Sequence, residues 1–195
     1  MQNLRPGPGD ALLVIDVQND FLPGGALAVP NGDAVVPPLK RCIAFFHWNR
    51  LPVYASRDWH PANHCSFKAQ GGPWPPHCVA DTAGAAFAAG LELPADAVVI
   101  SKADTPETDS YSAFGNTDLD SRLKAAGVKR LFVGGLATDY CVLHSVKDAL
   151  APGYRVVLLT DAVRAVELHH GDGERALLEM SRLGAQFAIS TELWQ

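Results

Sequence analysis

The stretch LFVGGLATDYCV, from Leu131 to Val142, reads as a strand, a tight turn and the start of a helix. Leu131–Val133 is a short apolar run typical of a buried strand, and the Gly-Gly pair that follows it permits a tight turn. Thr138 or Asp139 is a suitable N-cap for a helix over Tyr140–Leu150. This order predicts a parallel strand that leads directly into a helix, the repeating unit of an α/β fold.

Cys141 falls in the first turn of that predicted helix. A thiol there would meet unpaired backbone N–H groups and the positive end of the helix dipole, which favour its thiolate. The same N–H groups could hold an oxyanion that forms when the thiolate attacks a carbonyl. The simpler interpretation is a small apolar residue that packs the helix against a sheet. The rest of the chain decides between the two.

The composition fits one soluble globular domain over residues 1–195, since 48% of the residues are hydrophobic and 19% are charged. A net charge of −5 and the lack of any Lys/Arg run argue against a nucleic-acid partner. The polar start of the chain has no signal-peptide pattern and no apolar run could span a bilayer, so we expect a cytoplasmic protein without a membrane partner.

Without an export signal, the cysteines are expected to be thiols or ligands rather than disulfides. They are Cys42, Cys65, Cys78 and Cys141.

Apolar runs and helical patterns alternate along the chain. The predicted strands are Ala11–Val17, Pro52–Ser56, Ala97–Ser101, Lys129–Val133, Arg155–Leu159 and Gln186–Ile189. The predicted helices are Lys40–Arg50, Asp118–Ala126, Tyr140–Leu150 and Gly173–Leu183. This alternation predicts an α/β fold of three layers, in which a doubly wound, mainly parallel six-stranded sheet carries helices on both faces.

Residues with chemical side chains follow four of these strands. They are Asp16, Asp58, Lys102 and Cys141. Because ligands bind outside the carboxyl ends of the strands in such sheets, the fold would gather these four side chains at one edge. This convergence favours a chemical role for Cys141.

A carboxylate and three imidazoles lie close together after the second predicted strand. They are Asp58, His60, His64 and His77. One Asp and three His suit a divalent transition metal such as zinc, iron or manganese, whereas calcium and magnesium prefer oxygen ligands. An alternative is a closed structural zinc site that uses Cys65 and Cys78. Each of these cysteines directly follows a histidine, and neighbouring side chains tend to point in different directions, so the alternative is the weaker one.

Four segments together resemble the signature of the nicotinamidases, which belong to the isochorismatase-like cysteine hydrolases. These segments are Asp16–Phe21 (DVQNDF), Asp58–Phe67 (DWHPANHCSF), Trp74–Cys78 (WPPHC) and Gly135–Val142 (GLATDYCV). They occur in chain order and the resemblance covers nearly the whole chain. The metal segment distinguishes the nicotinamidases from their metal-free relatives.

The resemblance implies roles for individual residues. It implies a catalytic triad of Asp16, Lys102 and Cys141, and metal ligation by Asp58, His60, His64 and His77. It places a cis peptide between Leu136 and Ala137, an oxyanion hole at the N–H groups of Ala137 and Cys141, and aromatic substrate walls at Phe21, Trp74 and Tyr111. The implied reaction is hydrolysis of nicotinamide to nicotinate and ammonia through a cysteine thioester, as part of NAD salvage. One divalent metal ion would bind the ring nitrogen, and pyrazinamide would be an analogue of the substrate.

Two departures from the family pattern concern loop geometry. Ala103 follows Lys102 where the family usually has glycine, and Val79–Thr82 reads VADT where it usually has Val-Gln-Gly-Thr. Two other functions stay open: a related cysteine amidase that acts on a carbamoyl or ureido compound, and a non-enzymatic metal-binding module. The sequence is also compatible with an oligomer, and it assigns no role to Cys42, Cys65 or Cys78.

Overall fold

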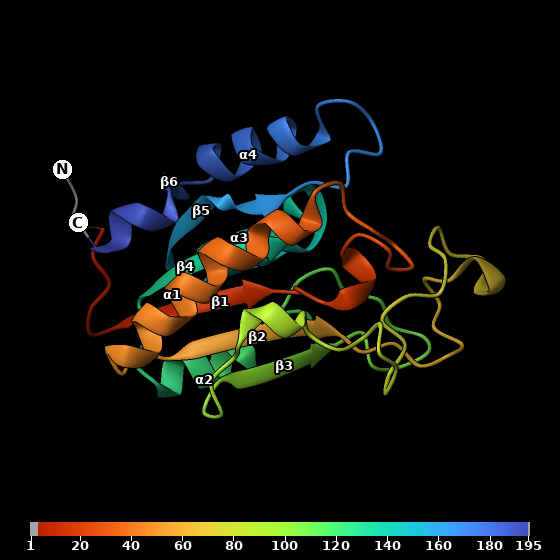
Figure 1. Cartoon of the computed structure of the whole chain (residues 1–195), viewed down its shortest axis with the longest axis horizontal. Helices are drawn as coiled ribbons and strands as arrows, with labels where there is room; N and C mark the ends of the chain where they lie inside the picture. The colour runs from red at the N-terminus through yellow and green to blue at the C-terminus, as the bar shows by residue number, and fades with distance from the viewer. Residues whose placement is uncertain (1–3, 195) are drawn as a thin grey trace.

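The computed structural model describes residues 4–194 and contains one six-stranded sheet with strand order β3-β2-β1-β4-β5-β6 (Figure 1). The strands are β1 Asp10–Ile15, β2 Val53–Asp58, β3 Val98–Lys102, β4 Arg130–Leu136, β5 Arg155–Arg164 and β6 Gln186–Ala188. Every neighbouring pair is parallel, so the expectation of a mainly parallel sheet is confirmed. All the carboxyl ends therefore meet at one edge of the sheet.

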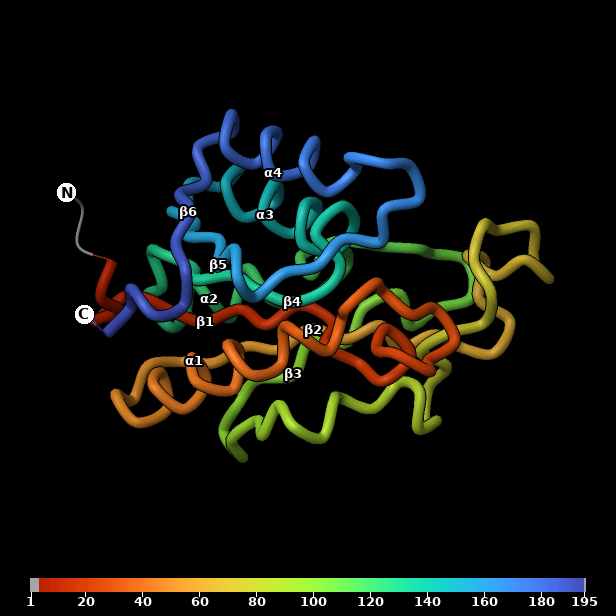
Figure 2. The backbone as a smooth tube through the Cα atoms, turned by 45° about the horizontal axis from the view of Figure 1, so that its top comes forward, coloured from red at the N-terminus to blue at the C-terminus, as the bar shows by residue number. Residues whose placement is uncertain are grey.

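Alternate side chains of β1 supply two separate cores. Leu12 and Val14 pack with helix α1, while Leu13 and Ile15 pack with helices α2, α3 and α4 on the opposite face. These helices are α1 Val36–Trp48, α2 Leu119–Ala125, α3 Leu143–Leu150 and α4 Asp172–Arg182. Figure 2 shows the chain as three layers, which confirms the expected doubly wound arrangement. Burial on both faces explains why the strands read as continuous apolar runs.

The strand order reverses direction at β1, which has β2 on one side and β4 on the other. Asp16 follows β1 directly, and Cys141 lies in the turn after β4. At such a switch point the connections leave on opposite faces of the sheet, which opens a crevice for a ligand. Gly135 brings β4 close to β1 here, because a side chain at this position would lie 2.0 Å from the carbonyl oxygen of Ile15.

The start of the helix after β4 differs from the expectation. Its first turn, Thr138–Val142, is a π-helix, and α3 begins only at Leu143. Ala137 occupies the N-cap position, and no side chain caps this end, so the predicted N-cap at Thr138 or Asp139 is wrong. The carboxylate of Asp139 instead binds backbone N–H groups of the loop that precedes α4.

The segment between β2 and β3, residues 59–97, contains two 3-10 turns and isolated bridges but no α-helix. Its first part, yellow in Figure 1, extends past the carboxyl ends of the strands, and its last part, light green, runs back along the sheet to the start of β3. The first part carries the three histidines expected to bind metal. Among the residues that the structure describes, no helix has the length and apolar character needed to cross a membrane.

Candidate active site and metal centre

Lys102, the last residue of β3, lies at the centre of the site and is 1% exposed. Its ammonium group donates hydrogen bonds to the Asp58 carboxylate, to the Ser110 carbonyl at 3.1 Å and to Cys141 Sγ at 3.6 Å. Asp16 Oδ2 lies 3.0 Å from Nζ as an ion pair. The sequence predicted the contacts with Asp16 and Cys141 but not the one with Asp58.

Asp16 is completely buried and presents one oxygen without a hydrogen bond. Oδ1 accepts a 2.6 Å hydrogen bond from Ser56 Oγ, whereas Oδ2 is the buried side-chain polar atom that lacks a donor among residues 4–194. Oδ2 is thus available to accept a proton from a neighbouring group.

The thiol of Cys141 is buried, and its protonation differs from the expectation. Burial raises the pKa of Cys141 well above its ordinary value, and Lys102 only partly offsets this. Burial likewise raises the pKa of Asp16, again against the effect of Lys102. The resting cysteine is therefore a thiol, although the helix start alone predicted a thiolate. Moving its proton to Asp16 leaves the total charge of the buried cluster unchanged, so desolvation does not oppose that transfer.

Lys102 itself stays charged. Burial alone would lower its pKa, but Asp16 and Asp58 reverse this and raise it well above the ordinary value. Burial alone would raise the pKa of Asp58, but Lys102 and then His60 reverse this and hold it well below its usual range. One ammonium thus balances carboxylates that belong to two different parts of the site.

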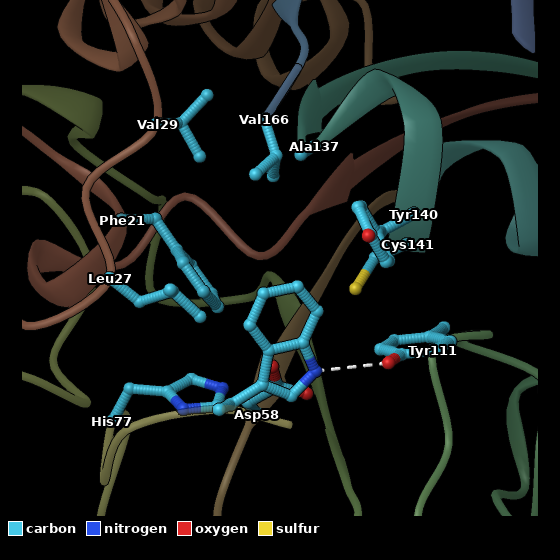
Figure 3. Close-up of a pocket in the computed structure, with 11 residues that line it drawn as sticks. Phe21, Leu27, Val29, Asp58, His77, Tyr111, Ala137, Tyr140, Cys141 and Val166 are labelled. Atoms are coloured by element: carbon cyan, nitrogen blue, oxygen red, sulfur yellow. Dashed lines mark hydrogen bonds between the residues drawn. The ribbon is translucent and has the colours of Figure 1, made fainter. Parts of the chain in front are cut away.

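Side chains from several parts of the chain enclose an apolar cavity next to Cys141 (Figure 3). The lining residues are Phe21, Leu27, Val29, Asp58, Trp74, His77, Tyr111, Ala137, Tyr140, Cys141 and Val166. All three predicted aromatic walls are among them, and Trp74 Nε1 donates a 3.0 Å hydrogen bond to Tyr111 Oη. The cavity holds about 40 Å³, less than the roughly 150 Å³ that accommodates benzene in a protein core. The cavity is not closed, because Leu27, Trp74, Tyr111 and Tyr140 also line an adjoining open pocket of about 410 Å³.

Asp58, His60 and His77 form a compact group of possible metal ligands. One ligand atom from each lies within 4.8 Å of the others, and all three side chains are buried. The Nδ1 atom of His60 lies 3.2 Å from the Ala103 carbonyl, and that of His77 lies 2.8 Å from the Pro75 carbonyl. Neither contact uses an Nε2 atom, and that of His60 lies 3.6 Å from Asp58 Oδ2, so the Nε2 atoms are the ones that could bind an ion. A carboxylate and two imidazoles held in this way fit a divalent transition metal.

His64 lies beside this group but points elsewhere. Its ring centroid is 4.1 Å from that of His60. However, Nδ1 contacts Ser66 Oγ at 2.8 Å, and Nε2 lies 3.2 Å from the Thr108 carbonyl. The structure thus brings together three of the four predicted ligands, while the nitrogens of His64 are engaged with other partners.

The chain matches the isochorismatase domain model over residues 10–192. It belongs to the isochorismatase family. The Escherichia coli nicotinamidase is 43% identical over 91% of this chain and 93% of the relative. The zinc complex of Pyrococcus horikoshii pyrazinamidase superposes with a TM-score of 0.90 at 48% identity, covering 93% of this chain and 99% of that one. PnC1 from L. infantum in complex with nicotinate gives a TM-score of 0.87 at 39% identity, covering 96% of each chain.

The backbone around the nucleophile agrees with the family pattern. The peptide bond between Leu136 and Ala137 is cis, as the resemblance implied. Ala137 and Cys141 both line the cavity, and the oxyanion hole at their N–H groups stays a prediction. Ala103 and Asp81, which occupy the two departures from the family pattern, have φ angles of 52° and 62°. Both therefore adopt the left-handed conformation that glycine favours.

The remaining cysteines of this isochorismatase-family chain lie outside the candidate metal group. Cys78 is completely buried in the core, where burial raises its pKa far above the ordinary range. Cys65 Sγ lies 4.0 Å from His64 Nε2, and Cys42 packs in the core beneath α1. Neither Cys65 nor Cys78 belongs to the compact group of ligand atoms, which counts against the cysteine-based structural site.

Gln18 is a positioning residue to which the sequence assigned no role. Its side chain is buried and pairs with the backbone of Asp58: Nε2 donates to the carbonyl at 2.8 Å, and Oε1 accepts from the N–H at 2.8 Å. A third bond joins Nε2 to the Ala85 carbonyl at 2.9 Å. Gln18 thus ties the end of β1 to the end of β2. The sequence feature that could have indicated this role is the position of Gln18, two residues after Asp16 and just past the end of a predicted strand.

Proposed function

We propose that this protein is a nicotinamidase that hydrolyses nicotinamide to nicotinate and ammonia through a thioester on Cys141. One observation carries this proposal: a single Lys102 ammonium contacts Asp16, Cys141 and Asp58. Cys141 and Asp58 line one aromatic cavity, and the same ammonium holds Asp16, the proposed proton acceptor, next to them. The nicotinamidase and pyrazinamidase relatives support the same substrate class for this chain.

The first step joins the substrate to the enzyme. The ring lies between Phe21, Trp74 and Tyr111, and Cys141 Sγ attacks the carboxamide carbon while Asp16 Oδ2 takes the thiol proton. The carbonyl oxygen becomes an oxyanion that accepts hydrogen bonds from the N–H groups of Ala137 and Cys141. Lys102 keeps the cluster compact throughout, because its ammonium offsets the negative charge that forms on sulfur.

The second step releases ammonia and then the acid. The C–N bond breaks as Asp16 returns its proton to the departing nitrogen, which leaves a thioester on Cys141. Water attacks the thioester carbon and gives a proton to Asp16, the C–S bond breaks, and the sulfur recovers that proton. Nicotinate leaves the cavity, and the enzyme returns to its starting state. We propose that this reaction belongs to NAD salvage.

Asp58, His60 and His77 would hold a divalent ion, which when bound would supply a Lewis-acid contact for the pyridine nitrogen. Zinc, iron and manganese all suit this ligand set. The zinc-bound pyrazinamidase relative supports such an ion here. We further propose that the chain acts on a small amide in the cytoplasm and that it needs neither nucleic acid nor a membrane as a partner.

Ammonia release from a panel of amides, measured together with metal content, tests the proposal. We expect nicotinamide and pyrazinamide to be turned over by a preparation that holds about one metal ion per chain. Faster turnover of a carbamoyl or ureido compound would favour the related amidase instead. Metal binding without ammonia release from any amide would favour the non-enzymatic module.

A further inference from the structure

Asp139 lies two residues before Cys141 and binds a different part of the chain. Its Oδ1 accepts a 2.8 Å hydrogen bond from the Val166 N–H, and its Oδ2 accepts a 3.0 Å hydrogen bond from the Glu167 N–H. These N–H groups belong to the loop between β5 and α4. One carboxylate thus joins the turn of the nucleophile to a loop 27 and 28 residues further along the chain.

Carboxylates also hold the remainder of that loop. Glu167 accepts hydrogen bonds from the N–H groups of Gly171 and Gly173, both at 2.8 Å. Asp172 accepts a 2.7 Å hydrogen bond from the His169 N–H. Residues 167–170 are exposed, so packing contributes little to their placement. The hydrogen bonds that Asp139 accepts from Val166 and Glu167 therefore set where the loop leaves the body of the protein.

Val166 is the residue of this loop that reaches the substrate cavity. It lines the cavity together with Ala137 and Cys141, and Figure 3 shows its side chain next to Ala137. Val166 also contacts the core cluster that contains Val29, although it is only partly buried. Its backbone N–H is one of the two groups that Asp139 holds.

We infer that Asp139 is a positioning residue that fixes Val166 as a wall of the substrate cavity, and so determines how tightly the ring is held. This inference rests on the proposed function, because it concerns the same cavity. Asp139 touches neither the reacting atoms nor the substrate, and its effect passes through Val166. The turn Thr138–Val142 therefore carries Cys141 and, through Asp139, also positions Val166.

Asp139→Asn tests the inference, since the amide is nearly the same size but has one acceptor oxygen and one donor group. The donor would oppose one of the two backbone N–H groups. We expect KM for nicotinamide to rise about tenfold while kcat stays within about threefold, because binding and not the chemical step is affected. Val166→Ala should give the same pattern. The double variant should be no worse than the more affected single variant, because both changes act on one wall.

Asp172→Asn is the matched control, because Asp172 holds the far part of the same loop and does not line the cavity. Its kcat and KM should match those of the unmodified protein. Hydrogen exchange gives a readout that needs no substrate: the amides of Val166 and Glu167 should exchange at least about tenfold faster in Asp139→Asn. Should that variant fail to fold, Asp139→Ser keeps one acceptor and should show the same separation of KM from kcat.

Three results would overturn the inference. The KM increases of the two single variants could multiply in the double variant, or Asp139→Asn could lose kcat at unchanged KM. The third is that the amides of Val166 and Glu167 exchange no faster in Asp139→Asn than in the unmodified protein. If the unmodified protein releases no ammonia from nicotinamide, the proposed function fails by itself. The hydrogen-exchange comparison then still decides whether Asp139 holds the loop.

Discussion

Asp16, Lys102 and Cys141 are placed by the ends of three strands, whereas His60 and His77 lie on the irregular segment between β2 and β3. The first group inherits its position from the parallel ladder, in which β1 and β4 are buried along their whole length. The second group depends on a few contacts of its own, such as those of the ring nitrogens with Ala103 and Pro75. Lys102 and Gln18 link the two regions through Asp58.

This contrast means that Asp16, Lys102 and Cys141 should keep their positions in variants that lose the metal centre. A ladder of buried hydrogen bonds opens only with the whole sheet, while an irregular loop can open locally. A bound ion would stabilise the loop, because it binds the folded site and not the unfolded chain.

The largest expected effect comes from the nucleophile. Cys141→Ala should lower kcat by at least about 10⁴-fold, because no other group in the cavity can form the acyl bond. Metal content should stay near that of the unmodified protein, since Cys141 is not part of the Asp58, His60 and His77 group. Ammonia release and elemental analysis measure the two quantities. Cys65→Ala is the control and should keep its activity; activity in Cys141→Ala with loss in Cys65→Ala would refute the assignment.

Removing a ligand from the irregular segment should separate the two regions. His60→Ala and His77→Ala should lower bound metal below about one tenth of an ion per chain, since each removes one of three closely placed ligands. His64→Ala should weaken metal affinity less, about tenfold, because its nitrogens contact Ser66 and Thr108. Elemental analysis after dialysis measures this. Iodoacetamide should still label Cys141 in all three variants, and lost labelling would mean that the regions do not separate.

The choice of substrate depends on both regions at once. Benzamide has nearly the shape of nicotinamide and the same amide, but it lacks the ring nitrogen that a bound metal would contact. We expect its kcat/KM to be about 10²- to 10³-fold lower, because a site built around a polar contact strongly rejects an analogue without it. Pyrazinamide keeps a nitrogen in the same place and should remain a substrate. Equal turnover of benzamide in a steady-state assay would show that the metal does not select the ring.

The smallest effect concerns the junction of the two regions at Ala103, where φ is 52°. Glycine adopts this conformation without strain, so Ala103→Gly should leave stability unchanged or raise it by up to about 1 kcal/mol. Ala125→Gly, the same substitution at the exposed last residue of α2, should instead cost up to about 1 kcal/mol. Urea unfolding compares the two variants. A larger loss in Ala103→Gly than in Ala125→Gly would mean that the Ala103 methyl group contributes to packing.

Local patterns in the sequence were sufficient for the fold. The apolar runs and the Gly-Gly turn predicted the strands, although some strand ends differ by a few residues. Strand β4 ends at Leu136 instead of the predicted Val133, and β5 ends at Arg164 instead of the predicted Leu159. Helix α1 begins earlier than expected, at Val36, because the prolines that follow fit the first turn of a helix. The convergence of Asp16, Asp58, Lys102 and Cys141 followed from the strand ends, and the ion pairs of Lys102 agree with it.

The sequence by itself therefore determined the α/β architecture and the edge at which the chemistry lies, because hydrophobic periodicity and turn residues act over short stretches of chain. Only the tertiary structure decided that Cys141 rests as a thiol, that His64 turns toward Ser66, and that Asp139 holds Val166 rather than capping its own helix. These features depend on burial and on hydrogen-bond partners that are distant in the sequence. No local pattern encodes them, since the packed fold sets both the desolvation of a group and the neighbour that it meets.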